Sequence, residues 1–206
     1  MASEVGICNA ALQMVKHSKR ITSLTQGTKE ASACEVIYEE LRDSLLEMHQ
    51  WNFATKRQKL ARLSEAPDFE FDYAYQMPSD YIRIVHLYGH PNGRGRIAYK
   101  IEGDTVVSDE TEIYARYIAR ISDPNKMRPT FRVALSKLIA SRLATSLAQS
   151  RSGAKELYSE FLTQDLPTAK SADSLQDFQE GLPESDWVAV RYGDREYYEP
   201  GEVELP

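Results

Sequence analysis

Residues 28–62 read TKEASACEVIYEELRDSLLEMHQWNFATKRQKLAR, and within them a helical pattern gives way to an extended one. Thr28 can cap a helix, and Glu30 adds a negative charge to its first turn, where the helix dipole favours one. Apolar side chains then recur at steps of three or four, which places them on one helical face: Ala31, Cys34, Ile37, Tyr38, Leu41, Leu45 and Met48. The sequence therefore predicts a long amphipathic helix that ends near His49.

Trp51 marks the point at which the pattern changes. From Phe53 the helical pattern stops, and the chain that follows is polar, basic and extended. Thr55, Arg57 and Lys59 lie on one side of it, and Ala54, Lys56, Gln58 and Leu60 on the other. A ring as large as that of Trp51 can set the angle between helix and strand, and buried aromatic rings usually serve packing rather than ligand stacking. We expect four residues of this junction to be critical for the fold: Leu41, Leu45, Trp51 and Phe53.

Further helices are expected on both sides of a β-rich middle. Apolar periodicity predicts one helix from Ser3 to about His17 and another from Pro129 to about Gln149. A last helix is expected to begin at Ala154, and Pro167 should kink or interrupt it because proline removes a backbone hydrogen bond. The two cysteines, Cys8 and Cys34, lie on apolar helical faces. They are expected to be small buried hydrophobes rather than a disulfide or metal ligands.

The region from residue 53 to 124 has the pattern of short antiparallel strands. Aromatic residues alternate from Phe69 to Tyr75, which predicts a strand with an aromatic face. Further strands are expected over 82–88, 96–102, 105–108 and 112–121, joined by turns such as Asn92-Gly93. The sequence thus predicts an α+β fold. A helical bundle of residues 1–52 and 125–180 would carry one small inserted antiparallel sheet.

The C-terminal segment, residues 181–206, differs in composition from the rest. Of 31 acidic and 25 basic residues in the chain, nine acids but only two bases lie from Asp177 onward. Gly and Pro interrupt every periodic pattern there, so we expect an extended acidic arm. Large apolar side chains in such an arm suit contacts with a neighbouring subunit or another protein: Trp187, Val188, Val190, Tyr192, Tyr197 and Tyr198.

No set of residues indicates catalysis, a metal site or a cofactor. Residues 68–72 space three carboxylates as a calcium loop does, but the required glycine and terminal glutamate are missing. Residues 152–155 match a short pattern of serine acyl-enzymes without its companion motifs. We therefore expect a protein that is not an enzyme and binds no cofactor. No membrane contact is expected either, because no apolar run approaches the roughly 20 residues that span a bilayer.

Basic residues of the middle region form a candidate contact patch: Lys56, Arg57, Lys59, Arg94 and Arg96. Together with the run from Lys16 to Arg20, they leave open a nucleic-acid-binding module as an alternative function. The net charge of −6 argues against it, because binding driven by phosphates needs clustered positive surface. A hydrolase whose site the sequence does not reveal is a second alternative.

Several segments resemble the tail tubular protein A family, the head-to-tail adaptors of short-tailed bacteriophages. The resemblance extends roughly from Val5 to Tyr192, and Pro167 departs from the uninterrupted last helix expected of the family. The segments that carry it are Leu41-Arg42-Asp43-Ser44-Leu45-Leu46, His49-Gln50-Trp51-Asn52-Phe53-Ala54, Tyr73-Ala74-Tyr75-Gln76-Met77-Pro78-Ser79-Asp80, Arg116-Tyr117-Ile118-Ala119, Asp123-Pro124, and Trp187 with Arg191-Tyr192.

The resemblance implies a virion structural protein located at the junction of head and tail and made in the host cytoplasm. Such adaptors form a dodecameric ring beneath the portal protein. A tail nozzle, similar to tail tubular protein B, lies below the ring, and tail fibres or spikes often dock at its side. The double-stranded DNA genome passes through the lumen without specific binding.

Overall fold

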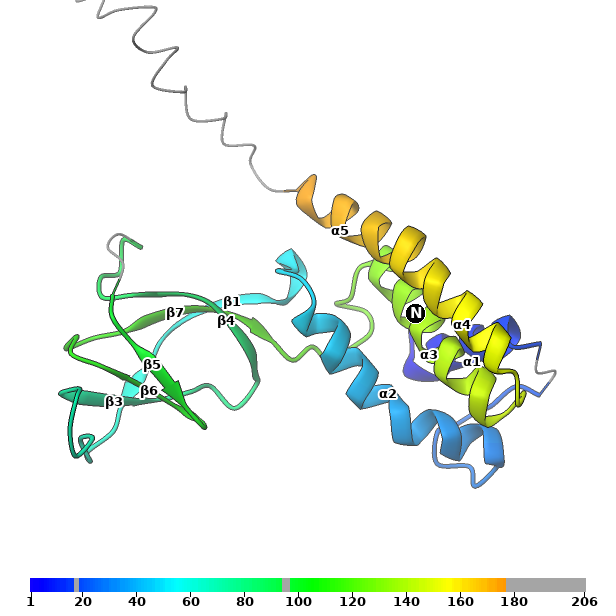
Figure 1. The fold of residues 1–206 in the computed structure, drawn as a ribbon, viewed down its shortest axis with the longest axis horizontal. Coiled ribbons are helices and arrows are strands. Elements are labelled where there is room, and N and C mark those ends of the chain that lie inside the picture. The colour runs from blue at the N-terminus through cyan, green and yellow to red at the C-terminus, as the bar shows by residue number, and fades with distance from the viewer. Residues whose placement is uncertain (17–18, 94–96, 177–206) are drawn as a thin grey trace, which may run out of the picture. The chain divides into compact units, whose positions relative to one another are not determined.

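The computed structural model describes residues 1–16, 19–93 and 97–176, and it confirms the α+β class (Figure 1). The predicted patch residues Arg94 and Arg96 lie outside the described residues. So does the predicted arm, residues 181–206, with its candidate contact residues Trp187, Val188, Val190, Tyr192, Tyr197 and Tyr198.

The α-helices of the described residues are α1 (Glu4–Met14), α2 (Lys29–Glu47), α3 (Pro129–Ser146), α4 (Arg151–Glu160) and α5 (Leu166–Ser174). Three of them, α1, α2 and α4, begin at a side-chain cap. Thr28 accepts a hydrogen bond from the Ala31 amide, which confirms the predicted start of α2. Ser150 caps α4 in the same way. That helix therefore begins three residues earlier than predicted.

Two other helix predictions are corrected. α1 ends at Met14 and not near His17, because Lys16 adopts a left-handed backbone with φ of 58°. The predicted interruption near Pro167 is present, but as a change in the helical hydrogen-bond pattern and not as a break in the helix. Residues Phe161–Asp165 form a π-helical turn, in which the Leu166 amide donates to the Phe161 carbonyl, and α5 continues from there.

The strands form two small antiparallel sheets rather than the single predicted one. Sheet A has the order β1 (Thr55–Lys59), β7 (Tyr114–Ala119), β4 (Tyr81–Tyr88). Sheet B has the order β2 (Ala61–Arg62), β3 (Tyr73–Gln76), β6 (Thr105–Ser108), β5 (Lys100–Glu102). Strand β7 lies between β1 and β4, so the middle region is not a meander of sequence neighbours. We call residues 55–119 the β-unit.

The predicted aromatic strand over 69–75 is only partly correct. Strand β3 begins at Tyr73, and Phe69 is 80% exposed. Alternation therefore predicted the strand too far toward the N-terminus. Glu70, between the two phenylalanines, has a φ of 76°, which an extended strand cannot include.

The helical bundle, α1 to α5, has one large apolar core. Helix α3 lies at its centre and contacts α1, α2, α4 and α5, several of which surround it in Figure 1. Phe131, Leu135 and Ile139 of α3 are fully buried there, as is Phe161 of the π-helical turn. Cys8 and Cys34 are free and buried in this core, which confirms their prediction as small hydrophobes.

Sheet A contributes to two cores because its strands alternate. Tyr117 of β7 is buried with Tyr75 and Val106 of sheet B, in a smaller core between the two sheets. Ile118, on the opposite face of the strand, is buried in the core of the helical bundle. One face of sheet A thus joins the bundle at its Ile118 end, and this anchors the β-unit.

Candidate interaction surface

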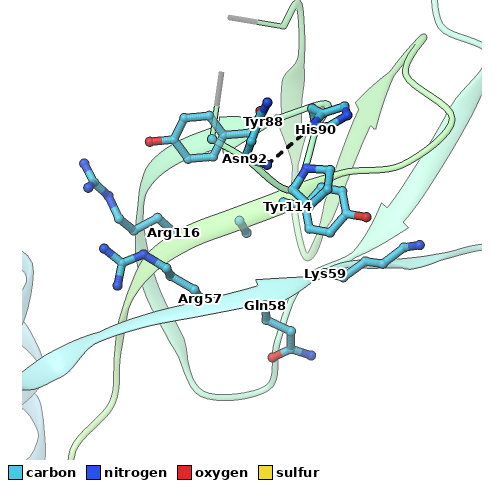
Figure 2. Close-up of a pocket in the computed structure, with 11 residues that line it drawn as sticks. Arg57, Gln58, Lys59, Tyr88, His90, Asn92, Tyr114 and Arg116 are labelled. Carbon is cyan, nitrogen blue, oxygen red and sulfur yellow. Dashed lines mark hydrogen bonds between the residues drawn. The ribbon is translucent and has the colours of Figure 1, made fainter. Parts of the chain in front are cut away.

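The face of sheet A that carries Ile118 also carries a row of basic side chains farther along the strands. In the strand register, Arg57 of β1 lies opposite Arg116 of β7, which in turn lies opposite His86 of β4. Figure 2 shows the Arg57 and Arg116 side chains projecting side by side from neighbouring strands, with Gln58 pointing the other way. Like charges directly opposite each other destabilise a strand pair. This arginine pair therefore has an energetic cost that a bound anion would offset.

The other basic residues of strand β1 already have acidic partners. Lys56 pairs with Asp80 at 2.5 Å, and Lys59 pairs with Glu112 at 2.5 Å. Glu112 raises the pKa of Lys59 through this hydrogen bond. Of the predicted basic patch, therefore, only Arg57 is left as an uncompensated cation in the described part of the chain.

Arg57 and Arg116 have no acidic partner among the described residues. The Nε atom of Arg116 is buried and has no hydrogen-bond partner there. A guanidinium group offers several donors in a planar fork that matches a carboxylate or a phosphate. Two adjacent guanidinium forks with no acidic partner in the described residues therefore form a surface suited to an anionic group.

A groove of about 420 Å³ lies over this pair, and we call it the Arg57–Arg116 groove (Figure 2). Tyr88, Tyr114, His90 and Pro91 add aromatic and apolar surface to its lining. The Asn92 amide donates to His90 Nδ1 at 3.4 Å, within the turn that follows β4. The groove thus combines cations with aromatic rings, a mixture that suits an acidic peptide or a nucleic-acid backbone.

Trp51 lies in the core of the bundle and not on a surface. Its side chain is fully buried, and its indole Nε1–H donates to the Leu45 carbonyl at 2.9 Å. The ring meets Phe131 edge to face, with ring centroids 5.0 Å apart. Phe53 also meets Phe131, at 5.0 Å. This burial supports the packing interpretation of Trp51 and excludes ligand stacking on its ring.

The C-terminal end of α5 is fastened beside the same junction. The Asn52 amide donates to the Asp173 carboxylate at 2.8 Å, and the Asn52 side chain donates to the Asp173 carbonyl at 3.0 Å. His49 Nε2 lies 3.8 Å from the same carboxylate. Asp173 is only 2% exposed, so these contacts stabilise a buried charge.

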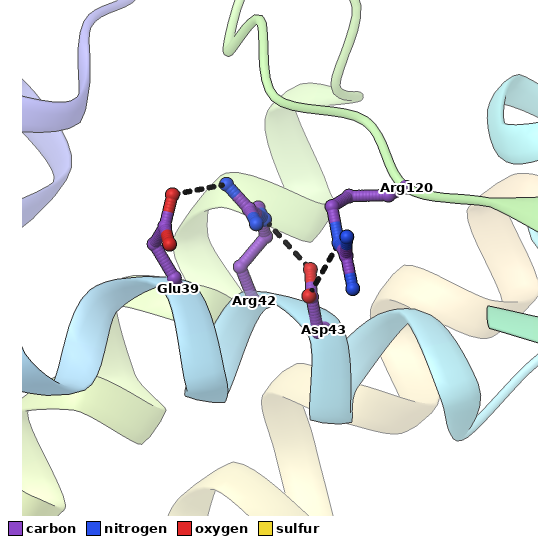
Figure 3. A network of polar contacts seen from close by, with 4 residues as sticks. All are labelled: Glu39, Arg42, Asp43 and Arg120. Carbon is purple, nitrogen blue, oxygen red and sulfur yellow. Dashed lines mark hydrogen bonds and ion pairs between the residues drawn. The ribbon is translucent and has the colours of Figure 1, made fainter. Parts of the chain in front are cut away.

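A second polar network connects α2 with the segment that follows β7 (Figure 3). Asp43 accepts from Arg42 Nε at 2.9 Å and from Arg120 Nε at 2.7 Å, so one carboxylate bridges two guanidinium groups. Arg42 is 2% exposed and lies 3.7 Å from Glu39. These contacts hold the exit of the β-unit against the bundle.

The residues predicted for the junction and those predicted for the contact patch therefore lie in different parts of the structure. Leu41, Leu45 and Trp51 are buried, and Phe53 is half-buried against the same core. Sequence reasoning missed Arg116, Tyr88 and Tyr114 as neighbours of Arg57. The alternation of Tyr114, Arg116 and Ile118 indicated that they share a face, but only the strand register places them beside β1.

The described residues contain no cluster of three or more histidine, cysteine or carboxylate side chains able to hold a metal ion. Among the helices of the same residues, none has the length and apolar character needed to cross a membrane. A comparison with models of known protein families matches none of them, and a comparison with curated proteins likewise finds no match.

Proposed function

We propose that this chain is a ring-forming head-to-tail adaptor of a short-tailed bacteriophage. In this proposal twelve copies join the portal protein to the tail nozzle at the junction of head and tail in the virion. Fibres or spikes dock at the side of the ring, and the DNA genome passes through its lumen. The protein acts by assembly, without catalysis or a cofactor.

The observation that carries the proposal is the position of the segments that resemble the adaptor family. Within the described residues, several of these segments lie at junctions of the fold, while Trp187 and Arg191-Tyr192 fall outside the described residues. Trp51 lies in the bundle core, and Asp43 bridges Arg42 to Arg120. Asp80 accepts from Tyr117, at the turn that follows β3. The proposal is supported because these segments hold the helical bundle and the β-unit together.

Assembly on a template follows from the distribution of exposed apolar side chains. Val36 on α2, Val133 on α3 and Leu162 in the π-helical turn are well exposed, but they lie on separate elements. Obligate oligomers usually have one large apolar interface. The isolated protein is thus expected to be mainly monomeric, and the portal would raise the effective concentration of neighbouring subunits.

Electron microscopy of the protein mixed with its portal protein tests this function. The expected result is a ring of twelvefold symmetry bound to one face of the portal, and no such ring in the protein alone. Light scattering coupled to size exclusion supplies the matched control without portal. Portals that stay bare at micromolar protein would refute the adaptor function, and a stable dodecamer without portal would refute assembly on a template.

The Arg57–Arg116 groove favours one alternative, a nucleic-acid-binding module. That function requires a salt-dependent shift of double-stranded DNA by the monomer, reduced by Arg57→Glu with Arg116→Glu. If these substitutions leave the DNA affinity unchanged, the groove does not bind DNA and no longer supports the alternative.

A further inference from the structure

We propose that the Arg57–Arg116 groove binds the acidic C-terminal segment, residues 194–204, of a second copy of this chain. The proposal rests on the adaptor function, because a ring brings copies of the chain side by side. It specifies which surface of one subunit binds the neighbouring subunit.

Charge complementarity is the first argument. Residues 194–204 read DREYYEPGEVE and contain five carboxylates against one guanidinium. The groove presents two guanidinium groups without an acidic partner in the described residues, and one of them has a buried Nε that lacks an acceptor. Carboxylates would supply acceptors and remove the repulsion between Arg57 and Arg116.

Spacing is the second argument. Side chains two residues apart share a face of an extended peptide and lie about 7 Å apart. Asp194 and Glu196 would thus face the same way, as the cross-strand neighbours Arg57 and Arg116 do. Tyr198 follows on that face, and the lining rings of Tyr88 and Tyr114 offer aromatic surface for it.

Symmetry is the third argument. The groove and the acidic segment are different parts of one chain, so a contact between copies is heterologous. Heterologous contacts generate closed rings when the rotation closes. Each subunit would then bind the segment of one neighbour and insert its own segment into the groove of the other. Every groove in the ring would be occupied.

A peptide of residues 177–206 with a fluorescent label tests the contact by fluorescence anisotropy on the full-length protein. We expect saturable binding that weakens in about 0.5 M salt. Arg57→Glu with Arg116→Glu should weaken it by at least about tenfold. The matched control, Arg142→Glu with Arg151→Glu, makes the same charge change on exposed helical residues and should alter binding by less than about twofold.

Charge reversal sharpens the test. A peptide with Asp194→Lys and Glu196→Lys should lose binding to the wild-type protein and regain it on the Arg57→Glu, Arg116→Glu variant. Thermal melts of both protein variants establish that they fold. Regained binding supports a direct contact, because a merely unfolded groove cannot be rescued by the opposite charge.

Three results would overturn the proposal. The first is an equal loss of binding in the groove variant and in the helical control. The second is peptide binding that appears only when the full-length protein itself carries Asp194→Asn and Glu196→Gln. That result would mean that the wild-type groove is occupied by the C-terminal segment of its own chain. The third is groove-dependent binding of a double-stranded DNA fragment without binding of the peptide.

The outcome is separable from that of the adaptor function. If the peptide binds the groove while portals stay bare, the adaptor function fails and the contact stands. If the groove variant forms rings on the portal as readily as the wild type, the contact fails and the adaptor function stands.

Discussion

The helical bundle and the β-unit have cores of different chemistry. The large side chains of the bundle core, such as Trp51, Phe131 and Phe161, are held mainly by packing, and Trp51 adds one hydrogen bond to the Leu45 carbonyl. Even the buried Tyr38 hydroxyl has no hydrogen-bond partner in the described residues, and burial raises its pKa. In the β-unit, Tyr75 donates to the Glu110 carbonyl, and the Tyr117 hydroxyl donates to Asp80 at 3.1 Å, with the Gln58 side-chain oxygen 3.3 Å from the same hydroxyl.

This difference indicates what each part depends on. Packing of apolar groups is insensitive to protonation, whereas hydrogen bonds to a surface carboxylate are lost when that carboxylate is protonated. The bundle is therefore expected to set the overall stability. The β-unit is expected to respond to pH and salt, which suits the part that carries the charged groove.

The largest effect is expected at the bundle core. Trp51→Ala should destabilise the protein by about 3–5 kcal/mol, because it removes a fully buried ring. Trp51→Phe, which keeps a ring but loses the hydrogen bond to Leu45, should cost less. Thermal and denaturant melts measure both. An unchanged midpoint with lost ring formation would instead make Trp51 an interface residue and would break the contrast between the two cores.

A smaller effect is expected where α5 is fastened. Asp173→Ala should cost about 2 kcal/mol, because the buried Asn52 contacts lose their acceptor. The exposed neighbour Ser174 provides the control, and Ser174→Ala should leave the melting temperature unchanged. Equal stability of the two variants would show that the polar contacts around Asn52 do not hold α5 in place.

The pH response of the β-unit is expected to depend on Asp80. Burial raises the pKa of this carboxyl, but hydrogen bonds from Lys56 and Tyr117 outweigh burial, so its pKa lies below the ordinary value of 3.8. A lowered folded-state pKa stabilises the protein above the unfolded value, and this stability is lost as the pH falls through the folded value. Asp80→Asn should thus cost about 1 kcal/mol near pH 7.

Chemical denaturation of wild type and Asp80→Asn across pH checks this expectation. The difference between them should shrink as the pH falls below 3.8. Glu70→Gln breaks the exposed pair with Lys100 and is the control, with almost no effect. A difference that stays constant down to the acid limit would show that Asp80 acts through its shape and not its charge.

The smallest effect on stability is expected at the C-terminus. Deletion after Leu182 should leave the melting temperature nearly unchanged, because the removed sequence lacks the periodicity of a packed element. The same deletion should abolish or greatly weaken ring formation on the portal. Calorimetry and electron microscopy measure the two effects. Truncated protein that decorates portals at wild-type concentration would exclude residues 183–206 as an assembly arm.

The helices could be predicted because they depend on local chemistry. The sheet arrangement and the groove could not, because they depend on pairing between strands that are distant in sequence. The Thr28 cap, the apolar face of α2 and the burial of Trp51 follow from neighbouring residues alone. The two-sheet arrangement depends on β7 pairing with strands distant in sequence, which no local pattern encodes. For the same reason Arg57 was found in the sequence but its neighbour Arg116 was not.

The π-helical turn has a consequence for insertions and deletions. Core-facing positions of the last helix advance by four from Leu157 to Phe161, then by five to Leu166, and return to ordinary steps at Ala169 and Asp173. The turn thus absorbs one extra residue and corrects the phase of the helix. Loss of a single residue between 161 and 165 would remove that extra residue and leave an ordinary α-helical step of four between Phe161 and Leu166, so the residues that follow would keep the same face. Asp173 would then stay beside Asn52, whereas loss of a residue elsewhere in the helix would rotate all that follows by about 100°. This turn is therefore the part of the last helix that best tolerates the loss of one residue.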